Sequence, residues 1–276
     1  MRSSLFGRIW TNAVALVLSV LFIFPVYWMV STAFKRSGDI ISATPQFIPL
    51  HPTLGHFKTT MHAQFFGNFW VNSLTATVGA VVAALVIALL AAVAVARMSF
   101  RGKKAFILMI MISQMAPWAI MQIAIYMIVR DANYLDKILP LLLFYMMMVL
   151  PLTIWTLRSF VAAIPKELEE SALIDGCNRF QAFWKVIFPL LAPGLMATSL
   201  FGFITAWGEY PLVLVLNKDP AHYTLPLWIT QFQTTFGNDW GATMAASTLF
   251  SLPVLVLFMI MQRRVVGGLT AGAVKG

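Results

Sequence analysis

The chain has 276 residues, of which 60% are hydrophobic and 11% are charged, and its formal net charge is +9. Soluble domains have about 45–50% apolar and about 25% charged residues, so this composition excludes an ordinary water-soluble domain. It also excludes a disordered chain, and the single cysteine, Cys177, excludes a disulfide framework and a cysteine-based metal cluster. The remaining class is a membrane protein with several spans.

Six stretches of the sequence are long and apolar enough to cross a bilayer, which takes about 20 residues. They cover residues 11–34, 69–96, 105–129, 138–157, 192–216 and 241–261. The only acidic or basic residue within them is Glu209. The first stretch is too long for the core of a signal peptide, so we expect it to be retained. The strands of a β-barrel would appear as short segments of alternating polarity, and these stretches do not have that pattern. We therefore predict an all-α polytopic membrane protein, one domain with six transmembrane helices.

The orientation follows from the Lys and Arg residues between the spans. Thirteen of the 19 lie at the termini and in the loops 97–104 and 158–191, and six lie in the other loops, 35–68, 130–137 and 217–240. The more basic set is expected in the cytoplasm, which places both termini there. The positive net charge is therefore a topology signal, and nucleic-acid binding is not predicted because no basic patch lies on a soluble face.

Sequence motifs for catalysis or cofactor binding are missing. No G-x-x-x-x-G-K-[ST], H-E-x-x-H or G-x-S-x-G run occurs, so the chain is not expected to bind ATP itself or to be an enzyme, and no cofactor is predicted. His51, His56 and His62 share an outer loop, but their spacing matches no helix face, and solvated loop histidines are the simpler interpretation. A secondary carrier would need ionisable residues within the spans, where only Glu209 occurs.

The cytoplasmic loop 158–191 is far longer than a simple connector, and its pattern predicts two short helices. Pro165 suits the first position of one helix, Gly176 suits a turn with positive φ after it, and Asn178 suits the cap of the second. Pro189 is expected to end the second helix. Its apolar stripe, which should pack on the membrane domain, is Phe180, Phe183, Trp184 and Ile187.

A helix pair with one apolar face and one acidic, small-residue face is typical of a docking element. Ser171, Ala172 and Gly176 would let a partner approach closely, and Glu170 would offer it a carboxylate. The alternative is a helix lying on the lipid surface. Such helices favour Lys and Arg on the polar face, whereas this one carries three glutamates, so docking is the preferred interpretation.

This segment resembles the EAA loop of ABC-importer permeases, whose pattern is E-A-A, three residues, G, nine residues and I-x-L-P. Here Glu170-Ser171-Ala172 precedes Gly176 at that spacing, and Val186-Ile187-Phe188-Pro189 follows nine residues later, with Ser, Val and Phe as departures. Further segments resemble the MalG-like, carbohydrate branch of binding-protein-dependent permeases. They are Leu173–Gly176, Gln181–Phe183, Trp207-Gly208-Glu209-Tyr210 and the ending 268–276. The resemblance covers nearly the whole chain.

The resemblance implies a type I ABC-importer permease fold in the cytoplasmic membrane, with this chain as one half of a heterodimer. The implied partners are a second permease subunit, two cytoplasmic P-loop ATPases and an extracytoplasmic solute-binding protein, and the implied cargo is a sugar moved by alternating access. A non-sugar solute such as a glycerophosphodiester stays open within the same branch. The implied ATPase contacts are Glu169, Glu170, Ser171, Ala172, Asp175 and Gly176. Of these, Glu170 is expected to be the ionic anchor, and Asp175 to support the turn.

The tail 268–276 is implied to reach the ATPase interface through Gly272, Ala273 and Lys275. Its small residues suit a thin extended insert, and the alternative is a frayed terminus.

The translocation pathway should be lined by polar and aromatic groups of the spans. The candidates are Glu209 with Trp207 and Tyr210, then Gln114, Trp118 and Gln122 at i, i+4 and i+8, and Asn72. The alternatives are an interfacial aromatic belt with a snorkelling Glu209, and contacts between helices for the others. In the third outer loop, Asn238, Asp239 and Trp240 are expected to contact the binding protein, and the alternative is that the loop is simply a lid.

Overall fold

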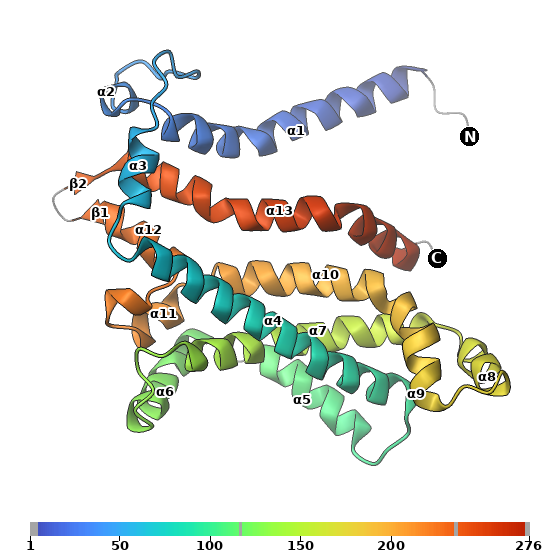
Figure 1. Ribbon diagram of the computed structural model, residues 1–276. Helices are drawn as coiled ribbons and strands as arrows, with labels where there is room; N and C mark the ends of the chain where they lie inside the picture. Colours follow the sequence, from blue (N-terminus) through green and yellow to red (C-terminus); the bar gives the residue numbers. More distant parts are fainter. Residues whose placement is uncertain (1–4, 116–117, 235–236, 274–276) are drawn as a thin grey trace. The chain divides into compact units, whose positions relative to one another are not determined.

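The computed structural model describes residues 5–115, 118–234 and 237–273. Five of its helices are long and apolar enough to span a membrane, and a bent pair counts as a sixth span (Figure 1). The five are α1 (Leu5–Ala33), α4 (Phe66–Arg97), α7 (Ile138–Ala163), α10 (Phe188–Trp207) with its preceding turns, and α13 (Trp240–Ala273). The bent pair is α5 (Lys103–Met115) and α6 (Trp118–Asp131). This is the all-α polytopic fold expected from the composition.

Shorter elements occupy the connections. They are α2 (Ser37–Ile40), α3 (Gly55–Met61), α8 (Lys166–Ile174), α9 (Arg179–Ala182), the π-helical turn η1 (Phe183–Ile187), α11 (Pro211–Leu216), η2 (Pro220–His222), α12 (Leu225–Ile229) and η3 (Thr230–Phe232). A two-residue hairpin, β1 (Gln233–Thr234) and β2 (Gly237–Asn238), pairs antiparallel. The chain forms two compact units, residues up to 66 with 228–252, and 67–227 with 253 onward.

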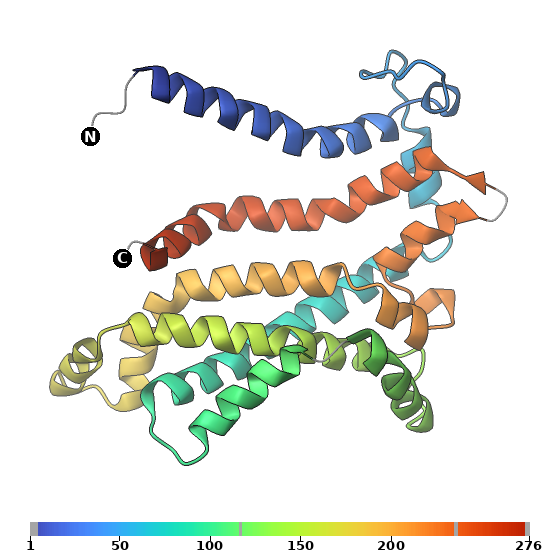
Figure 2. The same ribbon diagram turned by 180° about the vertical axis from the view of Figure 1, so that it is seen from behind.

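The larger unit is built around α7 and α10, which lie side by side in both views (Figures 1 and 2). Two glycines of α10 permit this close approach. A Cβ atom at Gly194 would lie 2.6 Å from the Phe160 ring, and one at Gly202 would lie 2.7 Å from Val149. Pro151 and Pro193 lie inside these helices, as membrane helices tolerate.

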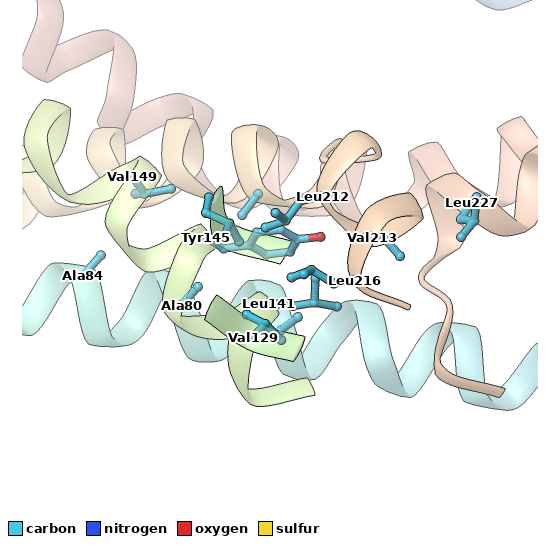
Figure 3. Packing of buried hydrophobic residues seen from close by; sticks show 13 residues of the cluster. Ala80, Ala84, Val129, Leu141, Tyr145, Val149, Leu212, Val213, Leu216 and Leu227 are labelled. Carbon is cyan, nitrogen blue, oxygen red and sulfur yellow. The ribbon is translucent and has the colours of Figure 1, made fainter. Parts of the chain in front are cut away.

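The core of this unit surrounds Tyr145 of α7, which is 2% exposed. Figure 3 shows its ring among Leu212, Val213 and Leu216 of α11, with small residues of α4 such as Ala80 on another side. Small residues on α4 let it pack closely, and large ones on α7 and α11 fill the remaining space. This core fixes the ends of α10 and α11, between which Glu209 lies.

In the smaller unit, the segment after α1 is held by polar contacts of the buried residues Lys35 and His56. The His56 Nε2 atom lies 3.0 Å from the Lys35 carbonyl oxygen, and its Nδ1 atom lies 3.8 Å from Asp239 Oδ1. Lys35 is buried with its Nζ atom 3.8 Å from the centre of the Trp28 ring, and burial lowers the pKa of that ammonium. His56 also fills the space beside Gly241, so a Cβ atom at that position would clash with the imidazole.

Two of the expected spans are broken in the structure, and a third is longer than expected. The third, 105–129, is two helices whose axes differ by 100°, so α5 and α6 do not share one continuous face. The fifth, 192–216, breaks after Trp207, and α11 begins at Pro211. A proline cannot donate to the preceding turn, so it starts a new helix here. The fourth span continues as helix beyond residue 157 to Ala163.

Candidate functional site at the cytoplasmic loop and in the membrane

The cytoplasmic loop forms the predicted helix–turn–helix. α8 ends at Ile174, and Gly176 follows with φ of +87°, a conformation that favours glycine. The Cys177 N–H donates to the Ala172 carbonyl and the Gly176 N–H to the Leu173 carbonyl, which closes the helix end. Asn178 then caps α9 by accepting from the Gln181 N–H at 2.8 Å, while the Gln181 side chain accepts from the Asn178 N–H at 3.0 Å. Local sequence chemistry therefore builds this turn.

Both proline expectations for the loop need correction. Pro165 is the N-cap of α8 rather than its first residue. Pro189 does not end the second helix, because α9 continues through the π-helical turn η1 into α10. In that wider turn the Phe188 N–H donates to the Phe183 carbonyl. A proline ring clashes with the carbonyl four residues earlier in a regular α-helix, and a widened turn just before Pro189 relieves that clash.

Within α8, the acidic and small residues have different environments. The Glu169 carboxylate lies 3.7 Å from the Arg97 Nε atom at the end of α4, and Arg97 also donates to the Ile164 carbonyl at 2.8 Å. Ala172 is 8% exposed and packs within this chain, which leaves little of its side chain for the contact with a partner that we expected. Glu169 is half-buried, and its contact with Arg97 holds α8 against α4.

The outward surface of the turn is formed by Glu170, Ser171, Asp175 and Gly176, all of which are exposed. Sequence reasoning missed Ile174, which is 86% exposed at the end of α8. The sequence contains a feature that could have identified Ile174, because this isoleucine precedes Asp175 and does not belong to the apolar stripe of the loop. Ile174 therefore adds an apolar side chain to the exposed surface of the turn.

A groove of about 570 Å³ lies between α8, α9 and the end of α4. The expected apolar stripe lines it, but only partly packs on the membrane domain: Ile187 is 2% exposed, whereas Phe180 is 71% exposed. Glu169, Glu170, Lys166 and Arg179 also line the groove. The groove therefore combines an apolar floor with charges of both signs.

The C-terminal tail departs from the expected extended form. α13 continues as helix to Ala273, so Gly272 and Ala273 lie in its last turn, and Lys275 lies outside the described residues. No proline follows Pro253 in the sequence, so nothing forbids helix there.

Within the larger unit, a cavity of about 300 Å³ lies between α5, α6, α7 and α10. Two predicted pathway residues, Gln114 and Trp118, line it together. The sequence did not single out the other residues of its wall, which are Met148, Val149, Leu152, Thr153, Thr156, Thr198, Phe201, Gly202 and Thr205. The sequence feature that could have identified this wall is the recurrence of threonine on the facing helices α7 and α10.

The remaining pathway candidates lie elsewhere. Gln122 does not line this cavity, and the bend between α5 and α6 separates it from Gln114. The Asn72 amide donates to the carbonyls of Ala221 and Tyr223, both at 3.0 Å, and so ties α4 to the third outer loop.

Around the break in the fifth span, Trp207 is 2% exposed and stacks on Phe203 with ring centres 5.2 Å apart. Glu209 lies in the break, where its Oε1 atom accepts from the Leu212 N–H at 2.9 Å. Its Oε2 atom has no hydrogen-bond partner in the described part of the chain, although the Tyr145 hydroxyl lies beside the carboxylate. Tyr210 is half-buried against the core around Tyr145. These three residues therefore hold the outer ends of α10 and α11.

The predicted contacts for a binding protein lie at the start of α13. Asn238, Asp239 and Trp240 are all exposed, and Asp239 also accepts from the Ala242 N–H at 2.9 Å and caps the helix. The three side chains are therefore accessible for a partner, and that of Asp239 is also held by the helix end.

Comparisons with known proteins give a family model and several relatives that match this chain. The sequence pattern described as "binding-protein-dependent transport system inner membrane component" matches residues 84–270. The chain is 62% identical to a "diacetylchitobiose uptake system permease protein DasC" of Streptomyces coelicolor, over 100% of both chains. It is 34% identical to a "trehalose transport system permease protein SugB" of Mycobacterium tuberculosis, over 91% of this chain and 92% of that protein.

Among solved structures, a chain of a bacterial ABC transporter that imports the acidic polysaccharide alginate superposes with a TM-score of 0.78. It is 21% identical, and the match covers 95% of this chain and 99% of that one. The likeness shows that the two chains share a fold.

Proposed function

Because this chain belongs to the family of binding-protein-dependent transport system inner membrane components, we propose that its cargo is diacetylchitobiose or a closely similar saccharide. The chain is a permease subunit of a sugar ABC importer in the cytoplasmic membrane, and it is not an enzyme. Its partners are a second permease subunit, ATPase subunits that hydrolyse ATP, and a solute-binding protein. The specific saccharide rests on the 62% identity to the diacetylchitobiose permease.

The relatives favour a sugar over a glycerophosphodiester. Their names specify diacetylchitobiose, trehalose and maltose. Uptake by the native cell tests the cargo directly. Deleting this chain should abolish uptake of radiolabelled diacetylchitobiose, and restoring it should recover uptake. Normal uptake in the deletion strain would contradict the assignment.

We propose that the outward surface of the α8 turn, formed by Glu170, Ser171, Ile174, Asp175 and Gly176, contacts an ATPase subunit. The observation that carries this proposal is the 86% exposure of Ile174 beside a turn built by local capping. Glu170 supplies an ionic contact and Ile174 an apolar anchor. Because α8 follows α7 closely and α9 runs into α10, a displacement of the turn moves both membrane helices, as alternating access requires.

We also propose contacts for the tail and for the third outer loop. In this proposal the tail contacts the ATPase through Gly272, Ala273 and Lys275, and the loop contacts the binding protein through Asn238, Asp239 and Trp240. The support for the second contact is the exposure of Asn238 and Trp240 beside a helix end held by Asp239. A gentle detergent extraction of the tagged chain tests the assembly. An ATPase, a second permease and a binding protein should co-purify, whereas recovery of the chain alone would contradict the assembly.

A further inference from the structure

We propose that the cavity between α5, α6, α7 and α10 is a binding subsite on this subunit for an uncharged part of the saccharide that is rich in hydroxyl or amide hydrogens. The proposal rests on the sugar-import function above and deepens it, because it names which chemistry this subunit recognises. The volume of the cavity, about 300 Å³, lies at the lower end of the range for small-molecule sites, about 300–1,000 Å³. It therefore suits one ring of a disaccharide rather than a whole oligosaccharide.

The wall of the cavity contains no charged side chain among the described residues. A carboxylate or ammonium group is expensive to hold within a membrane protein unless an opposite charge pairs with it. The cavity offers no such partner, so an ionic cargo would lose its hydration without compensation. An uncharged cargo does not pay this cost.

The threonines of the wall leave hydrogen-bond acceptors for a ligand. Three of the four hydroxyls donate to the carbonyl four residues earlier in their own helix: Thr153 to Val149 at 2.9 Å, Thr198 to Gly194 at 2.9 Å and Thr205 to Phe201 at 2.8 Å. A hydroxyl has one donor and two acceptor lone pairs, so its oxygen can still accept. A wall of acceptors binds the O–H and N–H groups of a saccharide and repels carboxylate oxygens, which only accept.

Two further groups complete the match to a sugar ring. Trp118 and Phe201 bring aromatic rings to the wall, and Gln114 brings an amide that both donates and accepts. Gly202 lies where α7 and α10 approach closely, and a Cβ atom there would meet Val149 at 2.7 Å. The floor of the cavity is therefore fixed by helix packing.

Uptake by the complete transporter tests the residues. Thr205→Val and Thr156→Val remove an oxygen and keep the shape of the side chain, and each should lower uptake of diacetylchitobiose at low concentration by about 2- to 10-fold. Thr205→Ser restores the oxygen and should restore uptake. Thr75→Val is the matched control, because Thr75 is an exposed threonine of α4 outside the cavity, and it should leave uptake unchanged. Uptake is normalised to the amount of chain in the membrane.

The outcomes separate this inference from the proposed function. Normal uptake by Thr205→Val and Thr156→Val would overturn the subsite and leave the import function intact. If the wild-type transporter takes up no diacetylchitobiose, the proposed cargo fails, and this inference fails with it.

Direct binding tests the charge preference. The purified complex, without its binding protein, is dialysed against radiolabelled diacetylchitobiose, with competitors that are either the neutral sugar or its C6-carboxylate analogue. The neutral sugar should compete at least tenfold better, and Thr205→Val should weaken its binding. Equal competition by the carboxylate, or no binding of either sugar, would overturn the inference.

Discussion

The cytoplasmic turn and the α7–α10 pair use the same residue types for opposite purposes. In the turn, Gly176 adopts a positive φ and Ile174 is exposed to water. In the helix pair, Gly194 and Gly202 only make room, and their neighbours are packed against them. The difference teaches that the pair is packed within this chain, whereas the turn presents an exposed surface for which we propose a partner. Mutations in the turn should therefore change coupling without unfolding, and mutations in the pair should do the reverse.

The largest effect is expected at Ile174. Ile174→Asp places a charge where we propose an apolar anchor, and a buried isoleucine contributes about 1.5–3 kcal/mol before the cost of burying the charge is added. ATP hydrolysis stimulated by the loaded binding protein should fall about 100-fold while the chain still inserts. Ile174→Val, which keeps the apolar contact, should retain most of the activity. Equal activity of the two variants would show that the turn is not covered by an ATPase.

The next effect is expected at the contact between Gly194 and Phe160. Gly194→Ala drives a methyl group into the Phe160 ring, which should lower stability in detergent by about 1–3 kcal/mol. Phe160→Leu in the same chain should recover part of this loss. The melting temperature of the purified transporter measures both. If Phe160→Leu gives no recovery, the helices separate at this point rather than clash.

A smaller effect is expected at Gly176. Gly176→Val forces a β-branched residue into positive φ, which costs roughly 1–2 kcal/mol, whereas asparagine tolerates this conformation. Gly176→Val should therefore reduce coupled ATP hydrolysis about tenfold, and Gly176→Asn should reduce it much less. Similar losses in both variants would mean that contact with the partner, rather than backbone geometry, selects glycine here.

The smallest effect is expected at Glu209, where a side chain caps the helix α11. Glu209→Gln keeps an acceptor for the Leu212 N–H, and Glu209→Ala removes it at a cost of about 0.5–2 kcal/mol. Uptake should fall in the alanine variant and remain near normal in the glutamine variant. Equal loss in both would show that the negative charge itself acts on the pathway.

Much of the fold follows from the sequence because its rules are local or dictated by the bilayer. Apolar length predicts the spans, Lys and Arg predict their orientation, and Asn178 with Gln181 predicts the cap of α9. The effect of each proline is harder to predict, because a proline excludes a regular α-helical turn before it but does not specify what replaces that turn. Pro189 is accommodated by a π-helical turn and Pro211 starts a new helix, and no local pattern distinguishes the two outcomes.

Sequence reasoning describes the candidate site best where sequence neighbours are also spatial neighbours. The turn from Glu170 to Gly176 is one such stretch, and within it the burial of Ala172 departs from the exposed surface that we expected. The membrane cavity is different, because Thr153 and Thr205 are brought together by the packing of α7 against α10. The predicted stripe of Gln114, Trp118 and Gln122 assumed a straight helix, whereas the structure bends between α5 and α6, so only Gln114 and Trp118 line the cavity.

The π-helical turn joins α9 to α10 without a break, so the chain is helical from Arg179 to Trp207. The helix changes direction there, and α9 runs at a steep angle to α10 (Figures 1 and 2). A π turn holds one residue more than an α turn, so converting η1 into an α turn would rotate α10 by about 100° about its own axis. Thr198 and Thr205 lie on α10, so a conformational change at the cytoplasmic end would alter which side chains of α10 face the cavity.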